Sequence, residues 1–240
     1  MKLKYISILI LFLFSLNVKA QDPNEKGNLT NYYNQTLHFG FALGINRANF
    51  SIDPSEHFER FDSLLKVEQG PKMGFNLGIV SEVRLRKYLT LRFVPNLSFV
   101  ERNLQYTFSR GDSIIIRTKT IESTFINFPL DLKLRSKRVK NFSAYLLGGG
   151  AYSLDLSSKA KVPLTTNPNP NEQVIKLLKN DFYYEVGSGA EFYMQYFKLA
   201  LELKLSMGTM NILKKENTVF SNSINKLNSK ILMFSITFEG

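Results

Sequence analysis

The stretch "FKLALELKLSMG", residues 197–208, alternates large apolar side chains with small or charged ones at every step. Because an extended chain sends successive side chains to opposite faces, one face of this segment is a continuous apolar band. The other face carries Lys198, Glu202 and Lys204. The apolar band therefore faces either a protein core or lipid, and the choice between them decides the fold.

The same period-two pattern returns along the chain and predicts a fold made of strands. No long window keeps the 3.6-residue period of an amphipathic helix, which argues against a helical fold. We count eight segments with this alternation: 37–46, 72–85, 89–100, 125–135, 142–156, 181–193, 197–208 and 230–238.

The connections between these segments alternate in length. Tight links are expected near 86–87, at 136–141 and at 194–196, whereas 47–71, 101–124, 157–180 and 209–229 are long. Short periplasmic turns and long outer loops are typical of transmembrane barrels, and about 9 to 11 tilted residues suffice to cross the bilayer. We predict an all-β fold over residues 37–240, an eight-stranded antiparallel up-and-down transmembrane β-barrel with four long extracellular loops. The second of these loops is expected to continue its strands outward as a hairpin.

A soluble barrel of lipocalin type would show the same alternation with the apolar face inside. Glycines such as Gly148 and Gly187 would then lie on an outer face with few charges around them. The unequal loops and the apolar final strand also favour the membrane barrel, since every backbone group of a closed sheet is paired within lipid.

The N-terminus reads as an export signal. Lys2 and Lys4 precede an apolar run that ends near Leu16, and Val18-Lys19-Ala20 is a small-residue cleavage site, so residues 1–20 are predicted to be a signal peptide. Residues 21–36 are expected to be a periplasmic tether. Cleavage lowers the formal net charge from +11 to +8 through the loss of three lysines. This balance favours contact with anionic lipid or an acidic partner over nucleic acid, which we do not expect as a partner of an exported protein.

Polar residues of the opposite parity are expected to fill the lumen. Eight strands leave room for side chains but not for a wide pore, so charges of both signs among small glycines predict a packed plug and not a channel. Because an unpaired buried charge is costly, we interpret these charges as a structural network. Its predicted members are Arg92, Asp131, Lys133, Glu185, Glu191, Lys198, Glu202 and Lys204. An aromatic girdle at the periplasmic interface is predicted from Tyr88, Phe142, Tyr145, Tyr193, Tyr196 and Phe197.

Catalytic and metal-binding signals are weak in this sequence. There is no cysteine, and of the two histidines His57 lies beside Asp53, Glu56 and Asp62, a group that reads better as a solvated acidic face. No Gly-x-Ser-x-Gly or paired-histidine motif is present. Arg110-Gly111-Asp112 is interpreted as a turn. We expect no enzymatic activity, no cofactor and no metal site.

Several motifs resemble a known family. They are Phe128-Pro129, the turn at 135–138, the three glycines 148–150, the Gly-x-Gly-x-x-Phe-Tyr of 187–193 and the strand 197–208. Together they are similar to the PorT family of outer-membrane proteins of Bacteroidetes. The resemblance implies a Gram-negative outer membrane, lipid contacts, and a role in the type IX protein secretion system, which supports gliding motility in some bacteria. A subunit of this kind would dock other secretion proteins and would not conduct cargo. The alternative is a stand-alone small barrel of adhesin or porin type.

Overall fold

The computed structural model describes residues 27–55, 64–110, 113–158, 175–216 and 219–240. The predicted signal peptide, His57 and the centre of the Arg-Gly-Asp turn lie outside these ranges. The described elements are η1 (Tyr32–Asn34), β1 (Leu37–Pro54), β2 (Leu64–Arg84), β3 (Leu89–Phe93), β4 (Asn96–Arg110), β5 (Ser113–Arg135), β6 (Phe142–Asp155), β7 (Asn180–Tyr193), β8 (Lys198–Gly208), α2 (Val219–Asn222) and β9 (Ile224–Glu239). Within the described chain, no helix combines the length and apolar character needed to cross a bilayer.

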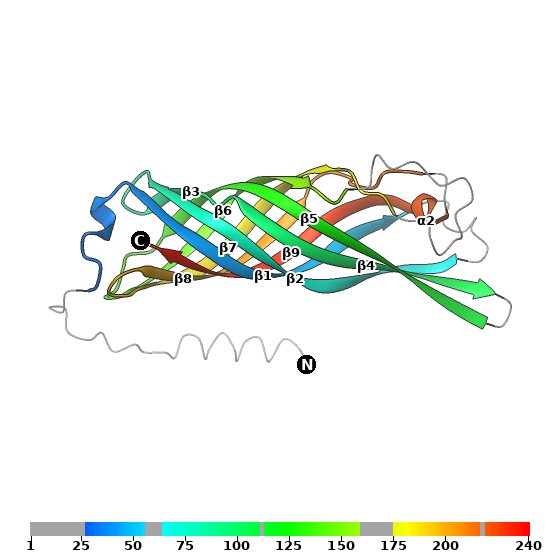
Figure 1. Ribbon diagram of the computed structural model, residues 1–240, viewed down its shortest axis with the longest axis horizontal. Coiled ribbons are helices and arrows are strands. Elements are labelled where there is room, and N and C mark those ends of the chain that lie inside the picture. The colour runs from blue at the N-terminus through cyan, green and yellow to red at the C-terminus, as the bar shows by residue number, and fades with distance from the viewer. Residues whose placement is uncertain (1–26, 56–63, 111–112, 159–174, 217–218) are drawn as a thin grey trace, which may run out of the picture.

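The strands form one closed antiparallel ring (Figure 1). Except for β3 and β4, each described strand pairs with the next along the chain, and β9 closes the ring by pairing with β1 from Gly40↔Glu239 onward. β3 and β4 together occupy one of the eight strand positions of the barrel, because both pair with β2 on one side and with β5 on the other. The predicted eight-stranded up-and-down barrel is therefore confirmed.

The break between β3 and β4 has a local cause in two prolines. The β3–β5 ladder ends at Phe93↔Leu130, and the β4–β5 ladder begins at Asn96↔Asn127. Pro95 and Pro129 both fall in the gap between these ladders, where their missing N–H groups take no strand hydrogen bond away. A single continuous strand over 89–100 was predicted, and the prolines divide it.

The apolar band of residues 197–208 faces outward. Leu203 is 49% exposed, whereas Lys198, Glu202 and Lys204 on the other parity of β8 are buried in the lumen. β1 shows the same division, with Phe39 and Phe41 outside. The outer wall is therefore the lipid-facing surface, as the alternation predicts.

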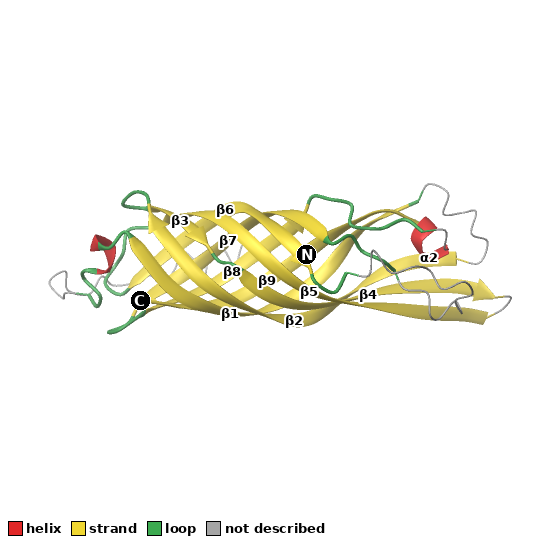
Figure 2. Cartoon of the chain, turned by 45° about the horizontal axis from the view of Figure 1, so that its top comes forward, coloured by secondary structure: helices red, strands yellow, loops and turns green. Residues whose placement is uncertain are grey.

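The first long loop is shorter than predicted, because β1 and β2 continue through 47–54 and 64–71. β4 and β5 likewise continue outward as a hairpin, as expected (Figure 2). Along these extensions the polarity of the two faces inverts. Phe50 and Leu104 point inward and are buried, whereas Arg47 and Gln105 point outward and are exposed. Extension is favoured because the strands leave the bilayer and enclose an apolar core of their own.

That core lies at the long-loop end and is completed by two of the loops. Residues 175–177, 212–213 and α2 pack against the strand extensions, and the Tyr106 hydroxyl donates a hydrogen bond to the Phe220 carbonyl oxygen at 3.2 Å. The members of this extracellular core are Phe50, Leu64, Leu104, Tyr106, Ile121, Ile175, Leu177, Ile212, Leu213, Phe220, Ile224 and Leu227. The chain thus folds over the outer opening of the barrel.

Candidate functional site

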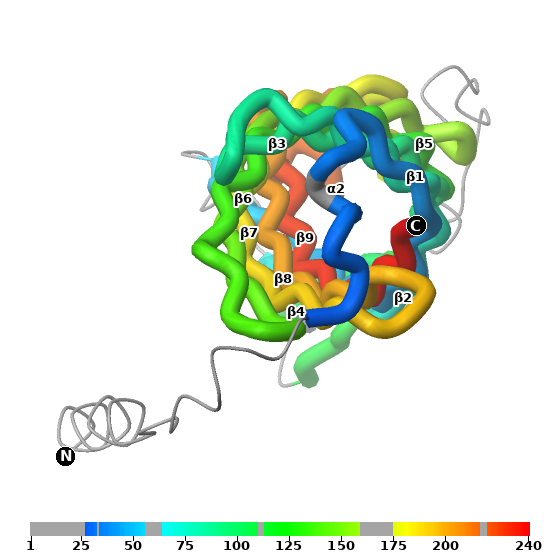
Figure 3. Tube along the Cα trace, turned by 90° about the vertical axis from the view of Figure 1, so that its left-hand side faces the viewer, coloured from blue at the N-terminus to red at the C-terminus, as the bar shows by residue number. Residues whose placement is uncertain are grey.

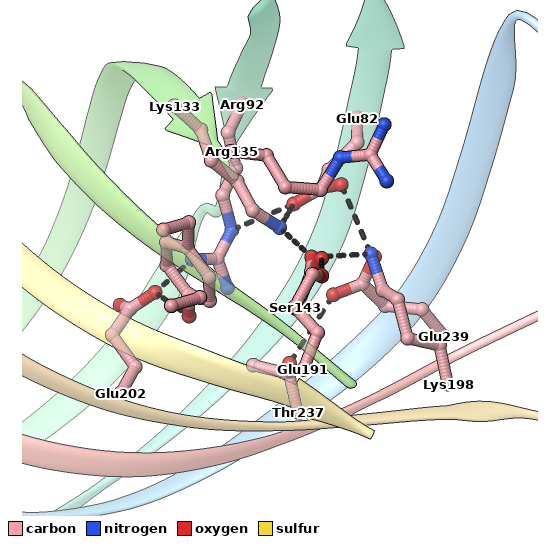
Figure 4. Close-up of polar contacts among 12 residues, drawn as sticks. Glu82, Arg92, Lys133, Arg135, Ser143, Glu191, Lys198, Glu202, Thr237 and Glu239 are labelled. Carbon is pink, nitrogen blue, oxygen red and sulfur yellow. Dashed lines mark hydrogen bonds and ion pairs between the residues drawn. The ribbon is translucent and has the colours of Figure 1, made fainter. Parts of the chain in front are cut away.

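The centre of the lumen is a network of buried ion pairs (Figure 4). Lys198 Nζ lies 3.3 Å from Glu82 Oε2, 3.1 Å from Glu191 Oε1 and 2.6 Å from Glu239 Oε2. Lys133 Nζ joins the same carboxylates, at 2.8 Å from Glu82 Oε1 and 2.5 Å from Glu191 Oε1. Five side chains from five strands are thereby held together, and each cation has at least two carboxylate partners.

Two further groups extend the network along the barrel. Arg92 pairs with Glu202 and, through Nε at 3.4 Å, with Glu82, while the Tyr145 hydroxyl donates to Glu202 at 2.7 Å. Lys204 Nζ lies 2.8 Å from Glu185 Oε2 and 3.5 Å from Asp131 Oδ2. The network therefore spans the ring, and its charged groups replace water as one another's partners.

All eight predicted lumen residues are buried and take part in these contacts. Sequence reasoning missed Glu82 and Glu239, which are 3% and 1% exposed. Glu82 joins the two lysines, and Glu239 pairs with Lys198. The alternation of inward and outward residues along each strand is the pattern that could have identified both. Glu82 continues the inward series of Asn76 and Gly78 on β2, and Glu239 directly follows the outward Phe238.

Two members of the predicted aromatic girdle point inward instead. Tyr145 and Tyr193 are 3% and 0% exposed, and the Tyr193 hydroxyl donates to Glu191 at 2.8 Å. The Tyr145 ring fits because Gly189 opposite has no side chain, and a Cβ there would lie 2.3 Å from Tyr145 Cζ. The girdle prediction is wrong for these two because their strand parity is that of the lumen, whereas Tyr88, Phe142, Tyr196 and Phe197 do lie outside.

The periplasmic end is closed by the chain that precedes β1. Residues 27–36 cross the opening, where Figure 3 shows them in blue. The Tyr32 ring stacks on His38 at 3.9 Å between centroids, and its hydroxyl donates to Glu239 Oε2 at 3.2 Å. Arg138 reaches from the β5–β6 turn to the carbonyl oxygens of Asn28 and Leu29. We call residues 27–36 the periplasmic plug; this part of the predicted tether is packed into the barrel.

Above the network the lumen is filled by an arginine that forms no ion pair with a carboxylate of the described residues. Arg102 is fully buried and donates to Ser229 Oγ and Ser123 Oγ, each at 3.0 Å. Its guanidinium lies 4.3 Å from the Phe50 ring centroid and 5.3 Å from that of Phe125. Cation–π contacts of this kind stabilise a desolvated cation, so Arg102 joins the charged layer to the extracellular core.

A three-stranded sheet projects beyond the ring at the outer end. Residues 64–71 of β2 pair with β4 but not with β1, and residues 113–123 of β5 pair with β4 but not with β6. Near the tip Ile114 and Ile116 are 69% and 64% exposed. We call β2 64–71, β4 102–110 and β5 113–123 the outer sheet; each of its two edge strands has one side without a strand partner in the described chain.

The histidine and acidic residues that the structure describes are distributed between the lumen, the plug and the surface. Within these ranges, no three histidine or acidic side chains are placed to share a metal ion. His38 is buried at the periplasmic plug, where its Nε2 lies 2.7 Å from the Tyr32 carbonyl oxygen.

Comparison with known proteins gives a family and several solved barrels. Ail, the attachment invasion locus protein of Yersinia pestis, is 11% identical over 86% of this chain and 100% of its own, with a TM-score of 0.38. Neisserial surface protein A is 12% identical over 83% and 95%, with a TM-score of 0.41. OprG of Pseudomonas aeruginosa is 13% identical over 83% and 94%, with a TM-score of 0.40. No curated protein matches this chain.

The family match covers most of the chain. Residues 19–214 match the family described as outer membrane protein beta-barrel domain. This agrees with the closed ring and its apolar outer wall, and it places the protein in the outer membrane of a Gram-negative bacterium, with lipid around the ring. The chain belongs to the outer membrane protein beta-barrel domain family.

Proposed function

We propose that the protein is a stand-alone docking barrel of adhesin type, which binds partners outside the cell and neither conducts solutes nor catalyses a reaction. The observation that carries this proposal is the outer sheet, whose two edge strands each have one side without a strand partner among the described residues. An exposed edge offers unpaired N–H and C=O groups to an extended partner segment, and side chains beside it select that partner. On β5 the exposed Ile114 and Ile116 supply apolar contacts. Arg117 and Lys119 lie on the other face of the strand, over the rings of Phe108 and Phe220.

The filled lumen supports the non-conducting part of the proposal. A solute crossing the barrel would have to displace the periplasmic plug, the ion pairs of Lys133 and Lys198, and the extracellular core in turn. Separating buried charges is costly when nothing replaces their partners. The filled lumen therefore favours partner binding at the two ends of the barrel over transport of a solute through it.

A second candidate is a docking subunit of the type IX secretion system. An adhesin needs only its outer side, whereas a secretion subunit should also hold a periplasmic partner. The observation that favours this candidate is the ordered periplasmic end of the barrel. Arg138 of the β5–β6 turn holds the plug in place, and Tyr196 of the neighbouring turn is 85% exposed. A defined surface is thus available to a partner on that side as well.

Site-specific photocrosslinking in the native host distinguishes the two candidates. A photoreactive residue is placed at Ile114 on the outer sheet or at Tyr196 on the periplasmic side, with lipid-facing Ile79 as the matched control. The adhesin proposal expects protein adducts from position 114 only. Adducts from position 196 would favour the secretion candidate, and the absence of adducts from both would contradict docking.

A deletion strain provides the independent test. Mass spectrometry of the culture medium follows the proteins that carry C-terminal sorting domains. Normal export is expected for a stand-alone barrel. Their loss from the medium and accumulation in the periplasm, reversed by complementation, would establish the secretion role and overturn the first proposal.

A further inference from the structure

The periplasmic rim contains a basic hollow of about 560 Å³ between the β2–β3 and β5–β6 turns. Six of its eight lining residues are arginine or lysine, and none is acidic. The basic residues are Arg84, Arg86, Lys87, Arg135, Lys137 and Arg138. A concentration of cations around one concavity is an anion-binding arrangement, in contrast to the balanced charges of the lumen.

The hollow is held in shape by hydrogen bonds from Arg135, the last residue of β5, to the β2–β3 turn. Arg135 Nη2 donates to the Lys87 carbonyl oxygen at 2.8 Å, and the Arg135 amide donates to the Tyr88 carbonyl oxygen at 2.9 Å. Within the turn itself the Arg86 amide donates to the Leu89 carbonyl oxygen at 2.9 Å. The β2–β3 turn is thus fixed against β5, and the cations are gathered before any ligand arrives.

Four of the six cations have no acidic partner in the described chain. Arg84, Arg86, Lys87 and Lys137 take part in no ion pair with a carboxylate there, and the last three are exposed. Arg138, by contrast, is engaged by the plug. Arginine and lysine with unused donors are the groups that bind phosphate in proteins.

The hollow lies beside the lipid-facing wall, and this position favours an anion that also carries an apolar part. Its other lining residues are Leu85 and Tyr88, which are exposed at the outer side of the turn, and tyrosine is typical of the membrane–water interface. An apolar hollow of about 600 Å³ adjoins it on the outer wall and shares Arg135 with it. Small residues form its floor, including Ala144 and Ala190, and Leu134 and Phe234 flank them. A ligand with both a phosphate and a hydrocarbon chain would occupy both hollows.

We infer that the basic rim binds the phosphate head group of an anionic phospholipid in the periplasmic leaflet, with an acyl chain in the adjoining apolar hollow. Basic pockets on membrane proteins bind such head groups, and each lysine or arginine near the surface strengthens the attraction. Free phosphate has the same head-group chemistry, but it has no hydrocarbon chain to fill the apolar hollow. An acidic protein segment would leave that hollow empty as well. The inference holds whichever partner docks at the outer sheet.

Native mass spectrometry of the full-length mature protein in detergent tests the inference. The protein is titrated with phosphatidylglycerol, with phosphatidylcholine of the same acyl chains, with inorganic phosphate and with a polyglutamate peptide. We expect a one-to-one phosphatidylglycerol complex at least tenfold tighter than the phosphatidylcholine complex. Equal binding of the two lipids would overturn the inference, as would displacement of phosphatidylglycerol by phosphate or polyglutamate at comparable concentration.

Three variants assign the binding to the rim. R86Q/K87Q/K137Q should weaken phosphatidylglycerol binding on the order of a hundredfold, because three surface cations are lost. The matched control R47Q/K215Q/K226Q removes three exposed cations from the opposite end and should leave binding unchanged. A144F fills the apolar hollow and should weaken lipid binding but not phosphate binding. Unchanged lipid preference in the rim variant, with a folded barrel shown by circular dichroism, would place the lipid elsewhere.

Discussion

At the scale of single residues, Glu82 decides how the lumen is held together. Its two carboxylate oxygens serve Arg92, Lys133 and Lys198, which come from three different strands. Burying any one of these charges alone would cost a large desolvation free energy, and their attraction for one another offsets that cost. Removal of one carboxylate therefore leaves several cations undercompensated.

We expect E82Q to lower the free energy of unfolding by about 3–5 kcal/mol, the range for breaking a buried ion pair. Urea unfolding in lipid vesicles, followed by circular dichroism, measures the change. E122Q is the control, because Glu122 is exposed on the outer sheet and should shift stability by less than about 0.5 kcal/mol. An E82Q barrel with an unchanged free energy of unfolding would show that the ion-pair network does not stabilise the barrel.

Two glycines, Gly189 facing the lumen and Gly148 facing outward, predict opposite outcomes for the same substitution. A Cβ at Gly189 would meet Tyr145 Cζ at 2.3 Å, whereas a Cβ at Gly148 has its nearest atom at 3.8 Å. G189A should therefore destabilise the barrel by about 1–3 kcal/mol through overpacking, and G148A should be neutral or slightly stabilising. Thermal unfolding of both variants under one set of conditions checks this, and equal midpoints would contradict it.

At the scale of elements, how far prediction from sequence succeeds depends on where an element lies. Strands inside the bilayer were readable because lipid on one side and charges on the other impose strict alternation, as in β8. Outside the bilayer the rule inverts, so 47–54 and 64–71 read as loop although they are strand. The sequence predicts a tether where the plug lies, because the contacts of the plug, such as Tyr32 with Glu239, join residues 207 apart in the chain. The eight lumen charges followed from parity, but their pairing needs the register between strands.

The plug is expected to stabilise the whole ring. Tyr32 is 6% exposed and contacts β1 through His38 and β9 through Glu239, the two strands that close the barrel. Y32A should lower the free energy of unfolding by about 3–5 kcal/mol, as for other buried aromatic residues. Y196A is the control because that side chain is 85% exposed. Equal urea midpoints for the two variants would mean that the plug lies on the barrel without supporting it.

At the scale of the whole molecule, the barrel is filled at three levels along its axis. The plug contacts the charge network at Glu239, whereas the extracellular core is built from other residues at the opposite end of the barrel. Closure is therefore redundant, and removal of one level should not open a path through the protein.

Planar-bilayer recording tests this redundancy. The intact barrel should show no single-channel steps at 100 mV, and a variant lacking residues 28–36 should be equally silent because the ion pairs beyond the plug remain. A porin reconstituted in the same bilayers confirms that steps are detectable. Discrete steps from the intact barrel would overturn the non-conducting proposal.

The inversion of polarity along β5 also fixes how far the protein reaches from the cell. From Phe125, near the level where the inversion occurs, the strand runs to Ser113, about 40 Å at roughly 3.4 Å a residue. At a tilt of about 40° its tip stands about 30 Å above the hydrocarbon. A peptide tag inserted between Arg110 and Ser113 would be raised by the same height, so antibodies should stain it on living cells even where surface sugars cover the lipid.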